Sequence, residues 1–359
     1  MGFAPAPGPQ AESEWWFQMN LDVLYQFNEK YAPYAGISMT SLLENNKQME
    51  KIRIFILGEN LSPDSITRFE RMADTYGCEI CFISIDDMIE RMKRMGLSSY
   101  RGSYAANMRL FLADVLDDSV DRLLYLDADT IVLENLHELL SLDLGAYPLA
   151  MAFDSVISNM RKNIGFSAQE DYYNSGVILF QMHKWKEQDL SGQIAAYVKK
   201  EKPNFSSPDQ DLLNIVCKNR IYRLPPQFNL QPMHLVFRTN DYWKYYLRAS
   251  YYEKSEIEYA RENPVILHFF RFMGEFPWHK GNVHPDNDVF DQYMQMSEWN
   301  DYVKQPSDAN YVMKIEKFLY RFLPGPLFLS IFRLAHVYMM QRTAKALKKG
   351  KQYHIYQGK

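Results

Sequence analysis

Two aspartates one residue apart, Asp127 and Asp129, stand at the end of an apolar run in this chain of 359 residues. The run, Arg122–Leu126, predicts a buried strand, so both carboxylates leave the core at the carboxyl end of a strand, where parallel α/β sheets bind their ligands. Carboxylates are costly to bury without a partner, and a divalent cation compensates them. Oxygen ligands that leave coordination positions open suit Mg²⁺ or Mn²⁺ bridging a diphosphate. The alternative interpretation is a turn that carries two solvated acids.

A histidine at the end of a second apolar run could complete such a metal site. His268 follows Val265, Ile266 and Leu267, and it becomes a third ligand only if the fold brings it beside the two aspartates. The alternative is a hydrogen-bonded core histidine, and His279 and His284 compete for the same role.

A second acidic triplet, Asp209-Gln210-Asp211, opens a helical pattern. Because Ser207 and Pro208 precede it, the simplest interpretation is a helix N-terminal cap. That interpretation accounts for one of the two acids and leaves Gln210 unexplained.

Strands and helices alternate through the first 130 residues, which predicts a mostly parallel α/β sheet flanked by helices. The predicted strands are 21–27, 52–57, 80–85, 122–126, 149–153 and 177–181, and the predicted helices are 34–46, 63–76, 104–115 and 184–199. Signature motifs of dinucleotide-binding enzymes, P-loop NTPases and α/β hydrolases do not occur in the sequence, which disfavours those classes.

Charge is distributed unevenly along the chain. Residues 314–359 hold ten lysines and arginines against one acid, Glu316, a charge of +9, so the other 313 residues carry −13. An acidic body disfavours nucleic acid as a partner, whereas a basic aromatic tail suits an anionic membrane surface. The tail's apolar stretch 327–340 is too short to span a bilayer but could lie flat on one, and Pro324-Gly325-Pro326 before it predicts a hinge. The alternative is a helix that packs on the body beneath solvated lysines.

The N-terminus and the cysteines point to a cytoplasmic protein. Residues 1–18 are rich in Pro, Ala and Gly without the pattern of a signal peptide, and we expect a flexible extension. Cys78 and Cys81 lie three apart in a predicted strand and therefore face opposite sides of the sheet, so we expect core thiols that share no metal.

Several motifs occur in an order that resembles glycosyltransferase family 8, over residues 19 to 300. They are Tyr31-Ala32-Pro33-Tyr34-Ala35-Gly36, Ser41-Leu42-Leu43-Glu44-Asn45-Asn46, the segment from Leu123 to Val132, Tyr172-Tyr173-Asn174-Ser175-Gly176-Val177, Asp209-Gln210-Asp211, and His268 with Pro277-Trp278. The resemblance implies a GT-A fold and transfer of a hexose from a UDP-sugar, with retention and commonly with Mn²⁺, to a glycan or lipid-linked acceptor of bacterial surface polysaccharide, lipooligosaccharide or glycoprotein.

The resemblance also implies roles for individual residues. Asp127, Asp129 and His268 would bind the metal, Asp127 contacting the donor as well. Asn28 and Tyr31 would receive uracil, and the donor sugar would lie beside Arg109, Asp154, Asn174, Ser175 and Gly176. Gln210 would lie beneath the reacting carbon, with Asp209 and Asp211 orienting hydroxyl groups.

Two segments depart from the family pattern. Asn28-Glu29-Lys30 stands where the family often has Asp-Asp-Asn. The diphosphate-binding loop usually has a lysine before Pro-Trp, but this chain has Phe276 there, and the loop from His268 is three residues longer. Lys280 or Arg271 would have to supply the missing charge.

The residues also indicate how transfer would proceed. A glutamine is a weak nucleophile, so departure and attack on the same face of the sugar are favoured over a covalent intermediate. The alternatives are a sugar nucleotidyltransferase and a silent carbohydrate-binding scaffold protein.

We therefore expect three regions and one location. The regions are a flexible extension over residues 1–18, a GT-A domain over 19–300, and a basic helical membrane-association region over 301–359. The location is the inner face of the plasma membrane, with peripheral attachment through Lys345, Lys348, Lys349 and Lys351.

Overall fold

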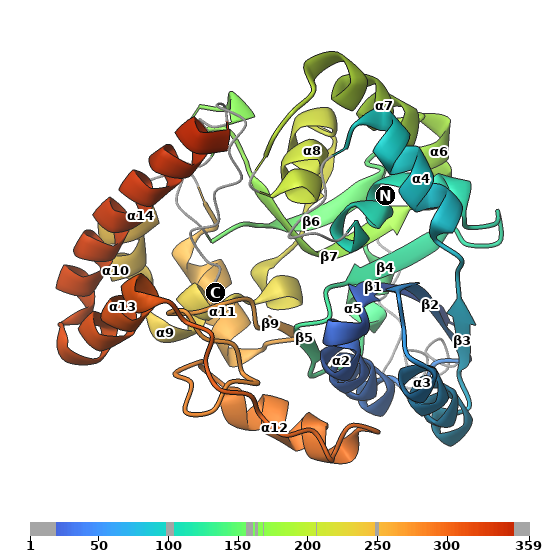
Figure 1. Ribbon diagram of the computed structural model, residues 1–359, viewed down its shortest axis with the longest axis horizontal. Coiled ribbons are helices and arrows are strands. Elements are labelled where there is room, and N and C mark those ends of the chain that lie inside the picture. Colours follow the sequence, from blue (N-terminus) through green and yellow to red (C-terminus); the bar gives the residue numbers. More distant parts are fainter. Residues whose placement is uncertain are drawn as a thin grey trace, which may run out of the picture.

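A seven-stranded sheet forms the centre of the molecule, in the order β3-β2-β1-β4-β7-β6-β8 (Figure 1). The computed structural model describes residues 19–347 except 98–103, 156–160, 162–163, 168, 206 and 248–250. The strands are β1 (Asn20–Asn28), β2 (Lys51–Glu59), β3 (Glu79–Phe82), β4 (Arg122–Leu126), β6 (Leu149–Phe153), β7 (Tyr173–Gln181) and β8 (Ile221–Arg223). Strands β3, β2, β1 and β4 run parallel, whereas β7 is antiparallel to β4 and β6. The mostly parallel sheet is confirmed and all six predicted strands are present, but the strand predicted over 80–85 ends at Phe82 and the one predicted over 177–181 already begins at Tyr173.

Helices cover both faces of this sheet, as Figure 1 shows. One face packs against α2 (Ala32–Asn45), α3 (Pro63–Tyr76) and α5 (His137–Ser141). The other face packs against α4 (Asp86–Met95), α6 (Met182–Glu187), α7 (Leu190–Glu201) and α8 (Pro208–Val216). Because both faces are covered, β4 is apolar on each: Leu123 and Tyr125 enter one core, and Leu124 and Leu126 enter the other. Further helical elements are η2 (Glu29–Tyr31), η5 (Pro226–Asn229), α9 (Pro232–Val236), α10 (Thr239–Asp241), η6 (Tyr242–Leu247), α11 (Lys254–Glu262) and α12 (Asn287–Met296).

Two predicted helices differ in the structure. The segment expected as a helix over 104–115 is a 3-10 helix, η3 (Ala105–Asp114), interrupted by non-helical backbone at Phe111. The helix expected over 184–199 is divided into α6 and α7 at Asp189, which takes a left-handed conformation and caps α7 by accepting a bond from the Gly192 amide.

The two cysteines of the C-x-x-C sequence are free thiols that pack against the two opposite cores, as predicted, but both are only partly buried and Cys78 precedes β3. Burial raises the pKa of Cys78 to about 11.

A second, two-stranded sheet connects distant parts of the chain. Strand β5 (Thr130–Val132) pairs antiparallel with β9 (Ile266–His268), with Thr130 opposite His268. The Phe269 amide also donates to the Asp129 carbonyl at 2.7 Å. Because β5 begins directly after the Asp127-Ala128-Asp129 turn, this pairing brings β9 alongside the aspartates.

The described part of the chain ends in two consecutive helices along one edge of the molecule, α13 (Tyr311–Phe322) and α14 (Gly325–Leu347) (Figure 1). Helix α14 buries Phe328, Leu329 and Phe332, and Phe328 stacks on Phe237 with ring centres 5.9 Å apart. Part of α14 therefore packs on the body. Within the described residues, no helix has the length and apolar character needed to cross a membrane.

Helix α13 carries a buried acid, Glu316, that faces the body of the protein. Glu316 is 8 % exposed, its Oε1 atom has no hydrogen-bond partner among the described residues, and burial raises its pKa to about 7. A carboxyl whose pKa is raised in the folded state contributes most to the free energy of unfolding at low pH, where it is protonated. The protein therefore loses stability as the pH rises from the ordinary pKa of a glutamate towards this raised pKa.

We expect Glu316→Gln to stabilise the protein by on the order of 2 kcal/mol at about pH 8 and to change stability little near pH 4.5. Urea unfolding at the two pH values measures this difference. Equal effects at both would contradict it.

Candidate metal and donor-sugar site

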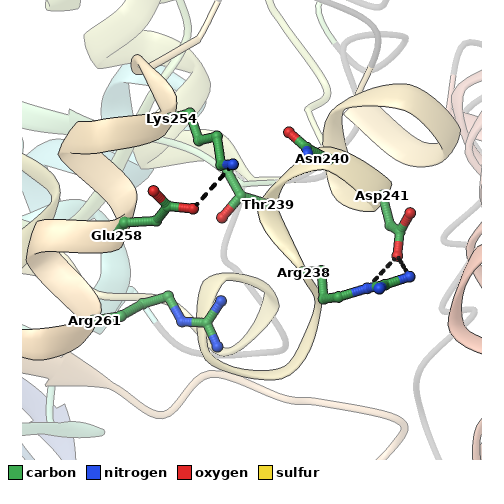
Figure 2. A pocket seen from close by; sticks show the side chains of 7 residues that line it. All are labelled: Arg238, Thr239, Asn240, Asp241, Lys254, Glu258 and Arg261. Carbon is green, nitrogen blue, oxygen red and sulfur yellow. Dashed lines mark hydrogen bonds and ion pairs between the residues drawn. The ribbon is translucent and has the colours of Figure 1, made fainter.

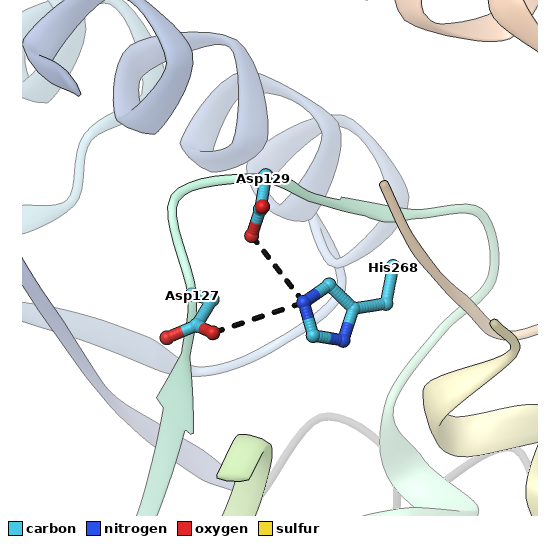
Figure 3. Close-up of side chains that lie close together, drawn as sticks. All are labelled: Asp127, Asp129 and His268. Carbon is cyan, nitrogen blue, oxygen red and sulfur yellow. Dashed lines mark ion pairs between the residues drawn. The ribbon is translucent and has the colours of Figure 1, made fainter. Parts of the chain in front are cut away.

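Asp127, Asp129 and His268 converge at the end of β4, and Figure 3 shows the imidazole facing both carboxylates. His268 Nε2 lies 3.4 Å from Asp129 Oδ1 and 3.7 Å from Asp127 Oδ2, and one ligand atom from each residue lies within 4.8 Å of the others. Two carboxylates and one imidazole form a three-ligand set dominated by oxygen, which fits a Mn²⁺ or Mg²⁺ site better than a closed structural zinc site with four ligands. The predicted juxtaposition of the three side chains is present.

The two oxygens of Asp127 have different environments. Oδ1 accepts hydrogen bonds from Arg109 Nη2 at 3.0 Å and from the Tyr125 hydroxyl, whereas Oδ2 faces His268. The Arg109 guanidinium lies 3.8 Å from the centre of the Tyr125 ring and is buried. Arg109 and Tyr125 therefore fix the carboxylate and leave one oxygen directed at the imidazole.

Gly176 allows His268 to reach this position. A β-carbon at Gly176 would lie 2.0 Å from Cε1 of the His268 ring, so any larger residue would displace the imidazole. The backbone of Gly176 also accepts a hydrogen bond from the Asp127 amide at 2.8 Å. The glycine predicted to line the sugar pocket thus contacts the candidate metal ligand itself.

The acidic triplet at the start of α8 points into the same region. Asp209 accepts from the Ser175 hydroxyl at 3.1 Å and lies 3.6 Å from Arg109, while Asp211 accepts from the Tyr172 hydroxyl at 2.6 Å. Ser207, the expected capping residue, makes no side-chain cap. Both acids are therefore held by side-chain networks, which the capping interpretation does not explain.

Gln210 lies between the two acids and is held at both ends of its amide. Its Oε1 accepts from the Ser175 amide at 3.0 Å, and its Nε2 donates to Asp154 at 3.1 Å and to the Tyr172 hydroxyl at 3.0 Å. Asn174 donates to the same Asp154 oxygen at 3.0 Å. The predicted sugar-pocket residues therefore form one connected network.

Burial shifts the ionisation of this cluster. It raises the pKa of Asp211 to about 7 and also raises the pKa of Asp209, against the opposing charge of Arg109. Burial lowers the pKa of His268, but the nearby carboxylates of Asp129 and Asp127 outweigh it, and the net shift is upward. Desolvation is therefore the main cause for the two acids, whereas the neighbouring carboxylates are the cause for His268.

The competing histidines take part in other contacts. His279 bonds to Glu275 at 3.0 Å, and His284 bonds to the Phe270 carbonyl at 3.0 Å. Burial lowers the pKa of His284 to about 4. Neither belongs to the three-residue group that could hold a metal.

The segment expected to receive uracil lies after β1. Asn28 has a buried Oδ1 atom with no hydrogen-bond partner among the described residues, and Tyr31 lies edge-on to Trp278 with ring centres 6.1 Å apart. Glu29 instead binds the start of α3, accepting from the Ser62 amide at 2.7 Å. The acid that departs from the family pattern therefore has a structural partner.

In the loop after β9, the phenylalanine that replaces the usual lysine takes part in aromatic packing. Phe276 stacks on Trp278 with ring centres 4.4 Å apart, and the Arg271 guanidinium lies 4.8 Å from the centre of the Phe276 ring. Arg271 is also paired with Asp308 at 2.7 Å, so its charge is already compensated. Lys280 is exposed at the end of this loop.

The family model described as glycosyl transferase family 8 matches residues 22–281. This chain belongs to glycosyl transferase family 8. Relatives of this glycosyltransferase include the general stress protein A of Bacillus subtilis, which is 27 % identical over 76 % of this chain and 92 % of that protein. A lipopolysaccharide 1,2-glucosyltransferase of Escherichia coli K12 is 23 % identical over 83 % of each chain.

The fold of this family 8 enzyme is shared with a solved structure. The galactosyltransferase LgtC, determined in complex with donor and acceptor sugar analogues, aligns with a TM-score of 0.64 at 23 % identity, over 79 % of this chain and 99 % of LgtC. The predicted GT-A fold is thereby confirmed. Family membership also decides against the nucleotidyltransferase alternative.

Three residues of the family 8 site were absent from the sequence predictions. The hydroxyl groups of Tyr125 and Tyr172 donate to Asp127 and Asp211, and Asn229 Oδ1 lies 3.0 Å from His268 Nδ1. Tyr125 stands two residues before Asp127, so a strand period of two places both on the same side, and this signal was available. Asn229 carries no such signal.

A separate polar hollow lies between α10 and α11 and shares no residue with the site (Figure 2). Its lining contains two ion pairs, Lys254 with Glu258 at 3.4 Å and Arg238 with Asp241 at 2.8 Å. We assign no role to it.

Proposed function

We propose that this glycosyltransferase transfers a hexose from a UDP-sugar to a glycan acceptor, with retention and with Mn²⁺ or Mg²⁺ as cofactor. The observation that supports this most is the convergence of Asp127, Asp129 and His268 within 4.8 Å, beside the network around Gln210. A divalent cation held there would stabilise the negative charge that develops as the diphosphate leaves, an effect worth several kcal/mol.

The donor would lie along the carboxyl ends of the strands. Asn28, through its unpartnered Oδ1, would accept from the base, and Tyr31 would stack on it. Lys280 is our choice for the diphosphate because Arg271 is already paired with Asp308. Arg109, Asp154, Asn174, Ser175 and Gly176 would border the sugar.

Gln210 would lie beneath the reacting carbon without becoming a nucleophile. Its Oε1 already accepts a hydrogen bond from the Ser175 amide, and an amide oxygen is weakly nucleophilic. Same-face departure and attack follow, with the leaving phosphate accepting the acceptor's proton. Asp209 and Asp211 would orient sugar hydroxyls.

The relatives support an acceptor of bacterial surface-glycan type. One of them is named a lipopolysaccharide 1,2-glucosyltransferase, and another, from Salmonella typhimurium, a lipopolysaccharide 1,3-galactosyltransferase. We propose an acceptor in surface polysaccharide, lipooligosaccharide or glycoprotein assembly.

We expect UDP release from one member of a UDP-sugar panel, dependent on Mn²⁺ or Mg²⁺. Asp127→Ala should abolish that release, because it removes a metal ligand, whereas Gln210→Ala should keep substantial activity. Coupled detection of UDP, with and without EDTA, measures both variants.

Two results would contradict this account. If UDP release from every active donor were independent of metal, the proposed cofactor would be wrong. A covalent sugar adduct on Gln210 or Asp209 would overturn the same-face mechanism. No release from any donor would favour the scaffold alternative.

We also propose that α13 and α14 attach the enzyme to the inner face of the plasma membrane. Each helix exposes an apolar stripe with the same spacing of four, three and four residues. The stripes are Tyr311, Ile315, Phe318 and Phe322 on α13, and Leu327, Ile331, Leu334 and Tyr338 on α14. Phe322 is 70 % exposed, and its neighbour Phe318 is 60 % exposed.

Charge complementarity selects a membrane as the partner of these stripes. Exposed Lys314, Arg321, Arg342 and Lys345 lie on the same helices, while the single acid, Glu316, is buried on the opposite side of α13. Each basic residue near an anionic leaflet contributes ~1 kcal/mol. Lys348, Lys349 and Lys351, also predicted to contribute, lie outside the described residues, as does the extension over 1–18.

We expect the double variant Phe318→Asp, Phe322→Asp to lose binding to vesicles that contain anionic lipid, while its UDP release is retained. Point variants are suitable because α14 buries three side chains in the body, so truncation would disturb the fold. Vesicle flotation measures binding.

Val303→Asp is the matched control, since Val303 is an exposed apolar residue outside both helices. Flotation of the double variant equal to that of the control would refute the membrane proposal.

A further inference from the structure

Asn229 is a fully buried amide at the end of η5, next to the candidate metal ligand. Its position is set by the backbone, because Leu230 bridges to Leu267 of β9 and the His268 amide donates to the Leu230 carbonyl at 3.0 Å. Strand β9 is therefore held between β5 on one side and the segment of Asn229 on the other.

The direction of every hydrogen bond around Asn229 follows from one backbone group. The Gly176 amide can only donate, and it lies 3.0 Å from one end of the Asn174 side-chain amide, which must therefore be the oxygen. Asn229 also lies 3.0 Å from that oxygen, so Asn229 presents its NH₂ group there. The Asn229 oxygen then faces His268 Nδ1 at 3.0 Å.

This order of donors and acceptors determines which ring nitrogen of His268 carries the hydrogen. Because the Asn229 oxygen can only accept, Nδ1 of His268 must donate to it. In the neutral ring, Nε2 then carries the lone pair, and Nε2 is the atom that faces Asp127 and Asp129.

The same chain of bonds continues to the sugar pocket. Asn174 donates through its own NH₂ group to Asp154 Oδ2, which also accepts from Gln210 Nε2. A chain of five hydrogen-bonded side chains thus runs from the candidate metal ligand to the residue proposed to lie beneath the reacting carbon. They are His268, Asn229, Asn174, Asp154 and Gln210.

We infer that Asn229 is a positioning residue that holds His268 in the tautomer able to bind a divalent cation through Nε2 and couples that ligand to the donor-sugar pocket. The inference rests on the proposed function, because it assumes a metal at Asp127, Asp129 and His268. A bond from the remote ring nitrogen to a neighbouring acceptor is a general means of orienting metal-binding histidines, and its removal typically weakens metal binding 10–100-fold.

Two substitutions distinguish the effects of the two hydrogen bonds that the Asn229 side chain makes. Asn229→Leu removes both bonds, so the dissociation constant for Mn²⁺ should rise about 10–100-fold. Asn229→Asp keeps an acceptor for His268 Nδ1 but sets a carboxylate oxygen against the Asn174 oxygen. Mn²⁺ affinity should therefore be close to that of the parent, while KM for the donor rises or kcat falls.

Electron paramagnetic resonance of free Mn²⁺, titrated with the full chain, measures the metal affinity directly. Asn46→Leu is the control: Asn46 is an equally buried amide that joins α2 to Leu136 away from the site, and Mn²⁺ affinity should be unchanged. If the parent binds Mn²⁺ and folded Asn229→Leu binds it equally tightly, the inference alone is wrong. If the parent binds no Mn²⁺, the proposed metal site fails and the inference fails with it.

A measurement on the unmodified chain covers the case in which Asn229→Leu does not fold. Long-range ¹H–¹⁵N spectra at a pH where the ring is neutral identify the protonated nitrogen, and His268→Asn assigns the signals. A hydrogen on Nδ1 supports the inference, and a neutral ring with its hydrogen on Nε2 overturns it.

Discussion

The antiparallel pairing of β5 with β9 is the constraint on which the site depends. The two strands have three residues each, yet their register places Thr130 opposite His268 and so brings a residue from late in the chain beside Asp127 and Asp129. Leu230 extends this contact on the far side of β9, and Gly176 leaves space for the ring. A shift of one residue in this register would turn His268 to the other face and replace it with an apolar side chain.

The electrostatics of the site follow from the same convergence. Asp127, Asp154, Asp209 and Asp211 approach one region in which Arg109 is the buried cation shared between Asp127 and Asp209. Burial raises the pKa values of Asp209 and Asp211, and for Asp209 this effect outweighs the opposing charge of Arg109. A divalent cation between Asp127, Asp129 and His268 would offset the two carboxylates and would allow a diphosphate to bind where carboxylates alone would repel it.

The sequence was informative where a local pattern determined the position of a side chain. Asp127 and Asp129 were predictable because they directly follow the apolar run of a strand that is buried on both faces. The acids of α8 suggested only a helix cap by their pattern, and their place in the site came from the family resemblance. The apolar run before His268 made it a candidate ligand beside other histidines, and the family resemblance then assigned it to the metal, since its partner strand is too short to show a period. Asn229 and Tyr172 could not be predicted, because their roles come from contacts between segments distant in the chain.

For the C-terminal helices, too, the sequence did not show which side chains face solvent. Composition indicated a basic tail over residues 314–359 with an apolar stretch over 327–340, but the exposed apolar stripe of α13 was not predicted, because an apolar stripe normally faces the core. Only the packing of Glu316 and Met313 against the body shows that the stripe of Tyr311, Ile315 and Phe318 faces outward.

The central claim is that one cation is held jointly by Asp127, Asp129 and His268. Anomalous diffraction at the manganese edge, from crystals of the full chain grown with Mn²⁺ and UDP, tests it most directly. The account predicts a single strong peak about 2.1–2.3 Å from Asp127 Oδ2, an Asp129 oxygen and His268 Nε2. A peak elsewhere, or a UDP-bound site with no anomalous density between these three side chains, would contradict it.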